Sequence, residues 1–181
     1  QRVDDFYSLL PLNPQFEMVF AEESVAVPAG MPELRSLFEE IEPGAGQQFD
    51  RFMEAARFKY EVGMKDFVTK PCHSWWEFVD VKIVKSALKL NLLTDFRKYV
   101  RQYFKDPRLV ALMEFPVIFL GAAPKDIPAM YSLMNYGGYG LGTWYPEGGF
   151  VKIIDAMVSV AKNLGVTFHV QRPVKRILLE A

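Results

Sequence analysis

The sequence predicts an α+β fold in which a helix-rich middle lies between short strands at both ends of the chain. Three observations predict it. Residues 15–27 alternate polar and apolar side chains in two short runs, which is the period of a strand. Residues 31–136 carry apolar side chains at helical spacing. Residues 140–179 then predict a strand, an apolar helix and two further strands.

The first region, residues 1–28, predicts a strand hairpin. Residues 15–20 and 24–27 are the alternating runs, and two glutamates stand between them. Pro28-Ala29-Gly30 follows directly and ends the second strand.

The second region, residues 29–139, predicts a series of helices. Met31–Ile41 has one apolar face, Pro43–Gly46 is a break, and a longer helix runs from Phe49 to Met64. Shorter helices are expected at Trp75–Val79, Val81–Leu93, Asp95–Phe104, Pro107–Phe115 and Ile127–Tyr136.

The third region, residues 140–181, predicts a strand, a helix and a strand pair. Gly140–Tyr145 is the first strand. The helix Phe150–Leu164 is apolar on nearly every side, so we expect it to be buried. Val166–Val170 and Val174–Leu179 alternate and are expected to pair as strands.

Chain length, composition and net charge limit the class of protein to which this sequence can belong. The chain has 181 residues, half of them hydrophobic, which suffices for a packed core. The net charge of −1 gives no sign of nucleic-acid binding. The longest apolar run, residues 109–123, is interrupted by Glu114 and Pro116 and is too short to span a bilayer. Because the chain begins at Gln1 and stops inside a predicted strand, we expect it to be a piece of a longer protein.

Two glycine clusters are candidates for cofactor contact. Residues 137–142 are glycine-rich, but they lack the G-x-G-x-x-G spacing and no helix opens after them, so we expect them to shape a turn. Gly148 and Gly149 open the apolar helix. They form either a tight packing joint, which the residues alone favour, or an open backbone surface for an anion or a flat cofactor.

The residues give little indication of a metal site or of a catalytic nucleophile. Cys72-His73 and the distant His169 lack the spacing of metal ligands, so no metal site is expected. The single cysteine also excludes an internal disulfide.

The stretch from Val81 to Lys105 is strongly basic and also apolar. A basic amphipathic segment with aromatic residues can lie in an anionic membrane surface. The alternative is a helix pair packed on the core with its lysines in solvent. Similarly, the many aromatic residues suit either a core or a tunnel for a long apolar ligand. Seven basic residues stand against Asp95 alone: Lys82, Lys85, Lys89, Arg97, Lys98, Arg101 and Lys105.

Four motifs resemble phytoene desaturases of the flavin-dependent amine oxidase superfamily. Asp5–Pro14 is similar to the family's entry into the substrate domain, and Tyr145–Phe150 to its Tyr-Pro-x-Gly-Gly signature. Pro128–Met134 stands where the family has an apolar helix, and Arg172-Pro173-Val174 matches the Arg-Pro-Val of the returning strand. The resemblance implies a helix-rich substrate domain excised from a two-domain FAD enzyme.

The resemblance also implies roles for individual residues. The backbone of Val174 would contact the adenine of FAD, and Gly148 and Gly149 would lie against the cofactor. Gly142, Trp144 and Tyr145 would line the floor of the substrate site. Glu77 is the candidate catalytic carboxylate, although Asp80 replaces the arginine that some relatives have three residues later.

The reaction implied is desaturation of a long apolar polyene such as phytoene, by a cytoplasmic enzyme held peripherally on an anionic membrane. Lys85, Lys89, Arg97 and Lys98 would then face the membrane. The phosphate-binding glycine loop of the family is missing from this chain, so the chain alone is expected to be inactive and to bind no FAD. The alternatives are a carotenoid isomerase, a retinol saturase, an amine oxidase, or a non-catalytic lipid-binding helical module.

Overall fold

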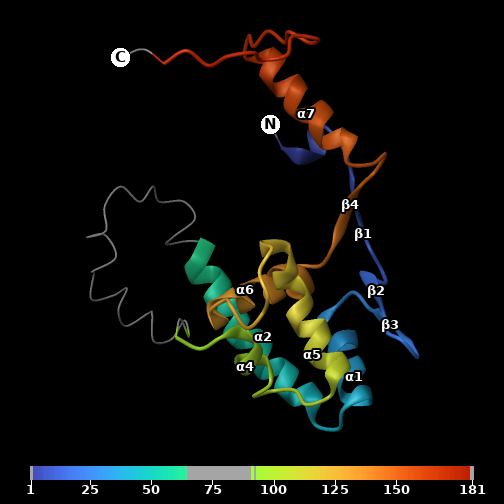
Figure 1. Cartoon of the computed structure of the whole chain (residues 1–181). Coiled ribbons are helices and arrows are strands. Elements are labelled where there is room, and N and C mark those ends of the chain that lie inside the picture. The colour runs from blue at the N-terminus through green and yellow to red at the C-terminus, as the bar shows by residue number, and fades with distance from the viewer. Residues whose placement is uncertain (1, 65–90, 92, 180–181) are drawn as a thin grey trace. The chain divides into compact units, whose positions relative to one another are not determined.

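The computed structural model describes residues 2–64, 91 and 93–179 (Figure 1). Helices and short strands are mixed, which agrees with the predicted α+β class. The chain divides into two compact units. One consists of Gln1–Leu10 and Trp144–Ala181, and the other of Pro11–Thr143.

The predicted hairpin is confirmed in the Pro11–Thr143 unit. Strands β2 (Phe16–Val19) and β3 (Ser24–Val27) are antiparallel, with Phe16 opposite Val27. Val25 and Val27 are buried while Ser24 and Ala26 are exposed, which is the alternation that the sequence predicts.

Helix α1 (Met31–Ile41) has the predicted bounds, and helix α2 (Ala45–Val62) starts earlier than expected. The break between them is short because the Glu39 carboxylate accepts hydrogen bonds from the amides of Gly44 (2.9 Å) and Gly46 (3.0 Å). Those amides belong to the start of α2, where helical partners are lacking. The carboxylate thus allows α2 to begin directly after the turn.

Helix α4 (Phe96–Val100) is much shorter than the predicted helix Asp95–Phe104. Asp95 is its N-cap, and its side chain accepts a hydrogen bond from the amide of Lys98 at 2.8 Å. The residues after Val100 form turns, and Phe104 packs in the core.

Helix α5 (Pro107–Glu114) agrees with the prediction to one residue, and two carboxylates fix its start. Asp106 is the N-cap and accepts from the amide of Arg108 at 2.9 Å. Glu42, at the end of α1, accepts from the amides of Lys105 and Asp106 at 3.0 and 2.8 Å. The start of α5 is therefore attached to the end of α1.

The predicted helix Ile127–Tyr136 is a succession of short turns. They are the 3₁₀ helix η5 (Ala129–Ser132), the single turn α6 (Leu133–Asn135) and the π-helical turn η6 (Tyr136–Gly140). Tyr139 donates a hydrogen bond to the carbonyl of Leu112 at 2.6 Å, and the turns are thereby tied to α5.

The core of this unit is aromatic. Phe38 on α1 contacts Phe49 on α2 at 4.6 Å between ring centroids, and Phe104 at 5.2 Å. Much of the aromatic content is therefore core packing. The larger buried side chains are Leu34, Phe38, Phe49, Phe52, Phe96, Tyr99, Phe104, Leu109, Leu112 and Met113.

The other unit contains two paired strands, β1 (Leu9–Pro11) and β4 (Trp144–Pro146), with the 3₁₀ turn η1 (Val3–Asp5) and helix α7 (Val151–Asn163). The predicted strand Gly140–Tyr145 is shifted, because Gly140 still belongs to the π-helical turn.

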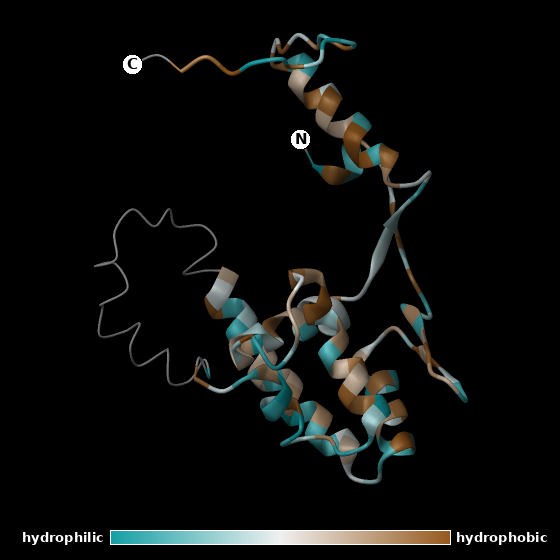
Figure 2. Cartoon of the chain, in the orientation of Figure 1, coloured by the Kyte–Doolittle hydropathy of each residue, from teal (hydrophilic) through white to brown (hydrophobic). Residues whose placement is uncertain are grey.

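Helix α7 has nearly the predicted bounds, Val151–Asn163 against Phe150–Leu164, and Gly165 follows its C-cap. Gly165 has a φ of 84°, and the amide of Val166 donates to the carbonyl of Ala161 at 3.0 Å, as in a Schellman motif. The prediction that α7 is buried is wrong for this structure. No residue of α7 is buried, and Met157 is 68% exposed. Figure 2 shows both hydrophobic and hydrophilic residues along this helix. Its apolar side chains find too few partners among the described residues to cover them.

The predicted strand pair Val166–Val170 and Val174–Leu179 is also wrong. These residues are exposed and irregular. A strand needs a neighbour that pairs with its backbone amides and carbonyls, and no described segment takes that place.

The predicted helices Trp75–Val79 and Val81–Leu93 fall outside the described residues, apart from Asn91 and Leu93. Within the described ranges, no helix is both long enough and apolar enough to cross a membrane.

Candidate functional site

The turn between β4 and α7 is built on two glycines. The amide of Gly149 donates to the carbonyl of Pro146 at 2.9 Å, which closes a four-residue turn. Gly148 stands third in that turn with a φ of 84°, and Gly149 has a φ of 91°. Both values lie in the region that residues with a side chain rarely adopt. Glycine is therefore required here by the backbone itself.

The two glycines differ in their surroundings. A Cβ atom on Gly148 would lie 3.0 Å from Cε of Lys152, whereas one on Gly149 would meet only the Tyr145 hydroxyl, at 3.6 Å. The backbone at Gly149 is thus open on one side. The structure therefore leaves room for a ligand beside the Gly149 backbone, whereas Gly148 lies close to the Lys152 side chain.

The predicted floor of the substrate site lies on the strand before this turn. Trp144 is 51% exposed and Tyr145 is 37% exposed. The Tyr145 ring contacts Phe150 edge to face, at 5.2 Å between centroids, and this contact joins β4 to the start of α7. Gly142 has a φ of 78° and lies just before β4.

Val174 is the residue predicted to contact the adenine of FAD. It is 82% exposed and stands in the irregular segment that follows α7. The structure therefore does not bring Val174 into a strand.

An apolar groove on the same unit was not predicted from the sequence. It has a volume of about 610 Å³ and lies between the N-terminal residues around η1 and one side of α7. Met157 and Leu164 belong to its lining. The apolar pattern of α7 is the signal in the sequence, but this pattern predicts a buried helix and not an open groove.

In the basic stretch Val81–Lys105, two of the cations predicted to face a membrane form ion pairs. Arg97 pairs with Glu114 through two contacts, at 3.2 and 3.3 Å, and Lys98 pairs with Asp95 at 3.0 Å. Lys98 remains 81% exposed. The candidates Glu77, Lys85 and Lys89 lie outside the described residues.

The aromatic side of that segment faces the core. Phe96, Tyr99, Val100 and Phe104 are all at most 4% exposed. Other apolar side chains of this unit are exposed. They include Leu93, which belongs to the basic segment and is 96% exposed, Val19 at 78%, and Phe119 at 76% in the 3₁₀ helix η4 (Phe115–Leu120). Within the described part, the packed-helix alternative therefore accounts for the aromatic residues from Phe96 onward.

The sequence does not predict that Lys59 is a buried lysine. Lys59 on α2 is 1% exposed, donates to the Ala129 carbonyl at 3.2 Å and to the Ser132 hydroxyl at 3.0 Å, and lies 4.0 Å from the centre of the Tyr99 ring. Burial without a carboxylate lowers the pKa of Lys59 to about 8. A lysine within an apolar helix face gave no sign of this role, because lysines at such positions usually reach solvent.

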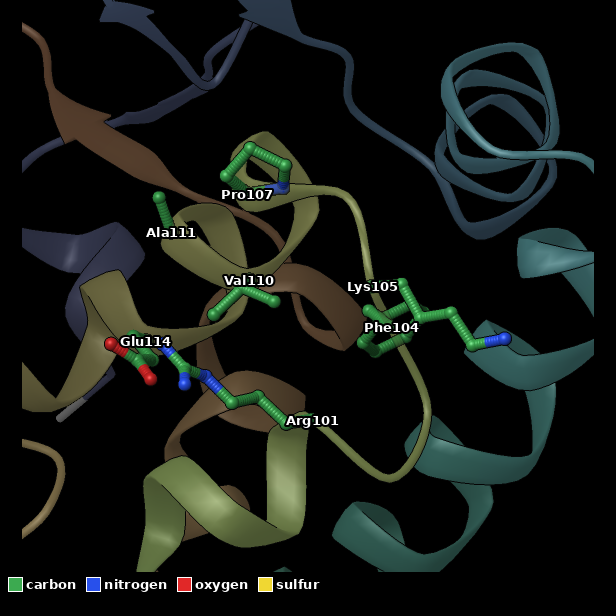
Figure 3. Close-up of a pocket in the computed structure, with 7 residues that line it drawn as sticks. All are labelled: Arg101, Phe104, Lys105, Pro107, Val110, Ala111 and Glu114. Atoms are coloured by element: carbon green, nitrogen blue, oxygen red, sulfur yellow. The ribbon is translucent and has the colours of Figure 1, made fainter.

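A second hollow lies between α5 and the turns that precede it (Figure 3). Its volume is about 620 Å³, and its lining includes Arg101, Phe104, Lys105 and Val110. No group of metal-ligating side chains occurs among the residues that the structure describes.

Comparison with known proteins identifies relatives over almost the whole chain. A family model described as flavin-containing amine oxidoreductase matches residues 27–181. A carotenoid 3,4-desaturase of Haloarcula japonica is 31% identical over 175 residues, which are 96% of this chain and 35% of that protein.

Two further relatives have similar coverage. A ζ-carotene-forming phytoene desaturase of Myxococcus xanthus is 27% identical, over 99% of this chain and 35% of its own length. A phytoene desaturase of Phycomyces blakesleeanus is 24% identical, over 98% of this chain and 31% of its own length. The chain thus spans about a third of the length of these relatives.

Proposed function

The chain belongs to the flavin-containing amine oxidoreductase family, and we propose that it is the central part of an FAD-dependent carotenoid desaturase. The relatives named as carotenoid and phytoene desaturases support this function, since the similarity to them extends over nearly the whole chain. The predicted regions 1–28, 29–139 and 140–181 would be the hairpin, the helical substrate region and the return toward the flavin domain.

The observation that carries the proposal is the open backbone at Gly149. Two successive glycines with positive φ leave the turn after β4 without side chains on one side. Gly148 and Gly149 would hold the cofactor there, and the backbone of Val174 would contact its adenine. FAD supplies the acceptor for the hydride that desaturation removes from carbon.

The substrate would be a long apolar polyene. Gly142, Trp144 and Tyr145 precede the glycine turn directly, so a polyene along β4 would lie next to the proposed cofactor site. The exposed rings of Trp144 and Tyr145 can exclude water from the reacting carbons and orient them. Glu77 would accept the proton from the neighbouring carbon.

The membrane is the proposed source of this substrate, because a long polyene is insoluble in water. Lys85, Lys89, Arg97 and Lys98 are the cations proposed to face an anionic surface, which would make the enzyme a peripheral membrane protein in the cytoplasm. Arg97 contributes less than the others, since its charge is already paired with Glu114.

The proposed function is tested with a Gly149→Leu variant of the full-length protein. The parent should convert phytoene dispersed in detergent into products with longer conjugation, measured by chromatography and absorbance. Gly149→Leu should remove this activity, because the leucine side chain would fill the open side of the turn.

Gly44→Leu is the matched control. Gly44 has a φ of 87° and open space around it, so it carries the same backbone strain far from the proposed site in the sequence. It should keep the activity. Absence of product from the parent, or activity in the Gly149 variant equal to that of the control, would contradict the proposal.

A further inference from the structure

The hollow beside α5 has an apolar floor and a cation on each side. Phe104 is fully buried and Val110 is 8% exposed, and together they form the base of the hollow. Arg101 and Lys105 both line it. In Figure 3 the Arg101 side chain runs toward Glu114, and the Lys105 side chain extends in the opposite direction.

The charge of the hollow is positive. Arg101 and Lys105 have no ion-pair partner within the described ranges. Glu114 also lines the hollow, but its carboxylate is 13% exposed and pairs with Arg97. Arg108, at the start of α5, is likewise occupied, by Asp106 and Glu23. The cations left available to a ligand are therefore Arg101 and Lys105.

One face of α5 lines the hollow; it is apolar at Pro107, Val110 and Ala111 and ends at the acidic Glu114. Pro107, Val110, Ala111 and Glu114 have the three- and four-residue spacing of one helix face. The chain continues from Glu114 directly into η4, where Ile118 is 59% exposed and Phe119 is 76% exposed. A protein face that combines exposed large apolar side chains with cations is typical of a surface that enters the interfacial layer of a membrane.

We propose that this hollow binds the phosphate headgroups of an anionic phospholipid surface through Arg101 and Lys105, while Ile118 and Phe119 enter the apolar layer. Two cations that extend in opposite directions suit a surface with many phosphates better than one small ion. The proposal rests on the membrane association that is part of the proposed function. It assigns the contact with the lipid phosphates to Arg101 and Lys105 instead of Arg97 and Lys98.

The first test measures binding of the full-length protein to vesicles by sedimentation. Vesicles of phosphatidylcholine with phosphatidylglycerol should bind the parent, and pure phosphatidylcholine should bind it poorly. The Arg101→Glu/Lys105→Glu variant should bind the anionic vesicles at least about 25-fold more weakly, from the contribution of each basic residue near an anionic surface. Binding by the parent should also weaken as salt rises.

The matched control is Arg51→Glu/Arg57→Glu, which makes the same charge change on the exposed side of α2. It should bind like the parent. Equal binding by the two double variants, both folded by circular dichroism, would overturn the proposal. Phe119→Ser should also weaken binding, whereas Val19→Ser, at a position that is 78% exposed, should not.

Inorganic phosphate separates a lipid site from a site for a soluble phosphate. Phosphate at millimolar concentration should neither displace the parent from vesicles beyond the effect of equal ionic strength nor bind measurably by calorimetry. Saturable phosphate binding that Arg101→Glu/Lys105→Glu removes would assign the hollow to a soluble ligand and overturn the lipid proposal.

An activity assay in detergent tests the proposed function independently of membrane binding. The Arg101→Glu/Lys105→Glu variant should still desaturate detergent-dispersed phytoene, since no membrane is needed there. A parent that binds anionic vesicles without desaturating phytoene would refute the function while supporting the lipid site.

Discussion

At the scale of single residues, the buried Lys59 is the most unusual group in the described part of the chain. Its ammonium has two oxygen partners and the Tyr99 ring, and no carboxylate neutralises it. A buried charge without a counter-ion disfavours the folded state wherever the lysine is protonated. Lys59 should therefore make folding depend on pH.

The stability of the protein should rise with pH above about 8. Burial lowers the pKa of Lys59 to about 8 from its usual 10.5, so between these values the unfolded chain binds more protons than the folded one. The cost below pH 8 is on the order of 3 kcal/mol. Urea unfolding between pH 7.5 and 9.5 should show this slope, and Lys59→Met should flatten it. Lys98→Met, at an exposed site, is the control and should keep the slope. An unchanged slope in Lys59→Met would contradict the assignment.

At the scale of elements, helix ends are fixed by carboxylates that come from both nearby and distant residues. Asp95 and Asp106 cap their own helices, while Glu42 reaches the start of α5 from the end of α1. The local caps can be expected from the sequence, because an aspartate before a short apolar run is a known start signal. The contact from Glu42 depends on how the helices pack.

Asp106→Ala should destabilise the protein by about 1–2 kcal/mol, the usual cost of losing an N-cap. The variant loses the hydrogen bond from the Arg108 amide and the ion pair with the Arg108 side chain. Asp50→Ala is the comparison, since it removes only an exposed pair with Arg35, at 2.9 Å, and should cost less than about 1 kcal/mol. Chemical unfolding measures both. Equal losses of stability in the two variants would mean that Asp106 acts only as a surface charge.

The contribution of Asp106 to stability should also depend on pH. Because Arg108 holds the pKa of Asp106 below its usual range, this contribution should disappear as the pH falls through that lowered pKa.

Helix α7 gives a second prediction at this scale. Met157 is 68% exposed in this chain, so Met157→Lys should change its stability by less than about 0.5 kcal/mol. In the full-length protein the same variant should lower the melting temperature or the flavin content, if the apolar side of α7 packs against the flavin domain. Lys162→Met, at an exposed position of the same helix, is the control. A stable, flavin-replete full-length Met157→Lys protein would show that this side of α7 stays in solvent.

At the scale of the whole molecule, the described chain has one well-packed unit and one open unit. The core of Pro11–Thr143 includes aromatic side chains from α1, α2 and α4. The unit that contains α7 exposes apolar side chains of the helix and of the segment after it. Under the proposed function, this second unit would be the part that contacts the cofactor and the flavin domain.

The chain of residues 1–181 should bind no FAD tightly on its own. It carries the proposed glycine turn and Val174, but no glycine loop of the kind that binds the pyrophosphate. The purified chain should be colourless, with no flavin absorbance after removal of free cofactor. A yellow protein with one flavin per chain would contradict this prediction.

The sequence by itself determined the family and the local elements. The hairpin, α1, α5, the bounds of α7 and its end at Gly165 depend on residue period, caps and glycine, which act within a few positions of the chain. The resemblance to phytoene desaturases rested on short motifs and is confirmed by relatives that align over nearly the whole chain.

Only the tertiary structure decided which apolar faces are buried, because burial depends on partners that are distant in the sequence. Apolar helix side chains are core in α5 and exposed in α7. The alternating residues after Gly165 do not form strands, since no described segment pairs with their backbone. Tertiary packing also decided that Arg97 is neutralised by Glu114 while Arg101 is not, and that Lys59 is buried. Residue type and spacing could not determine these outcomes.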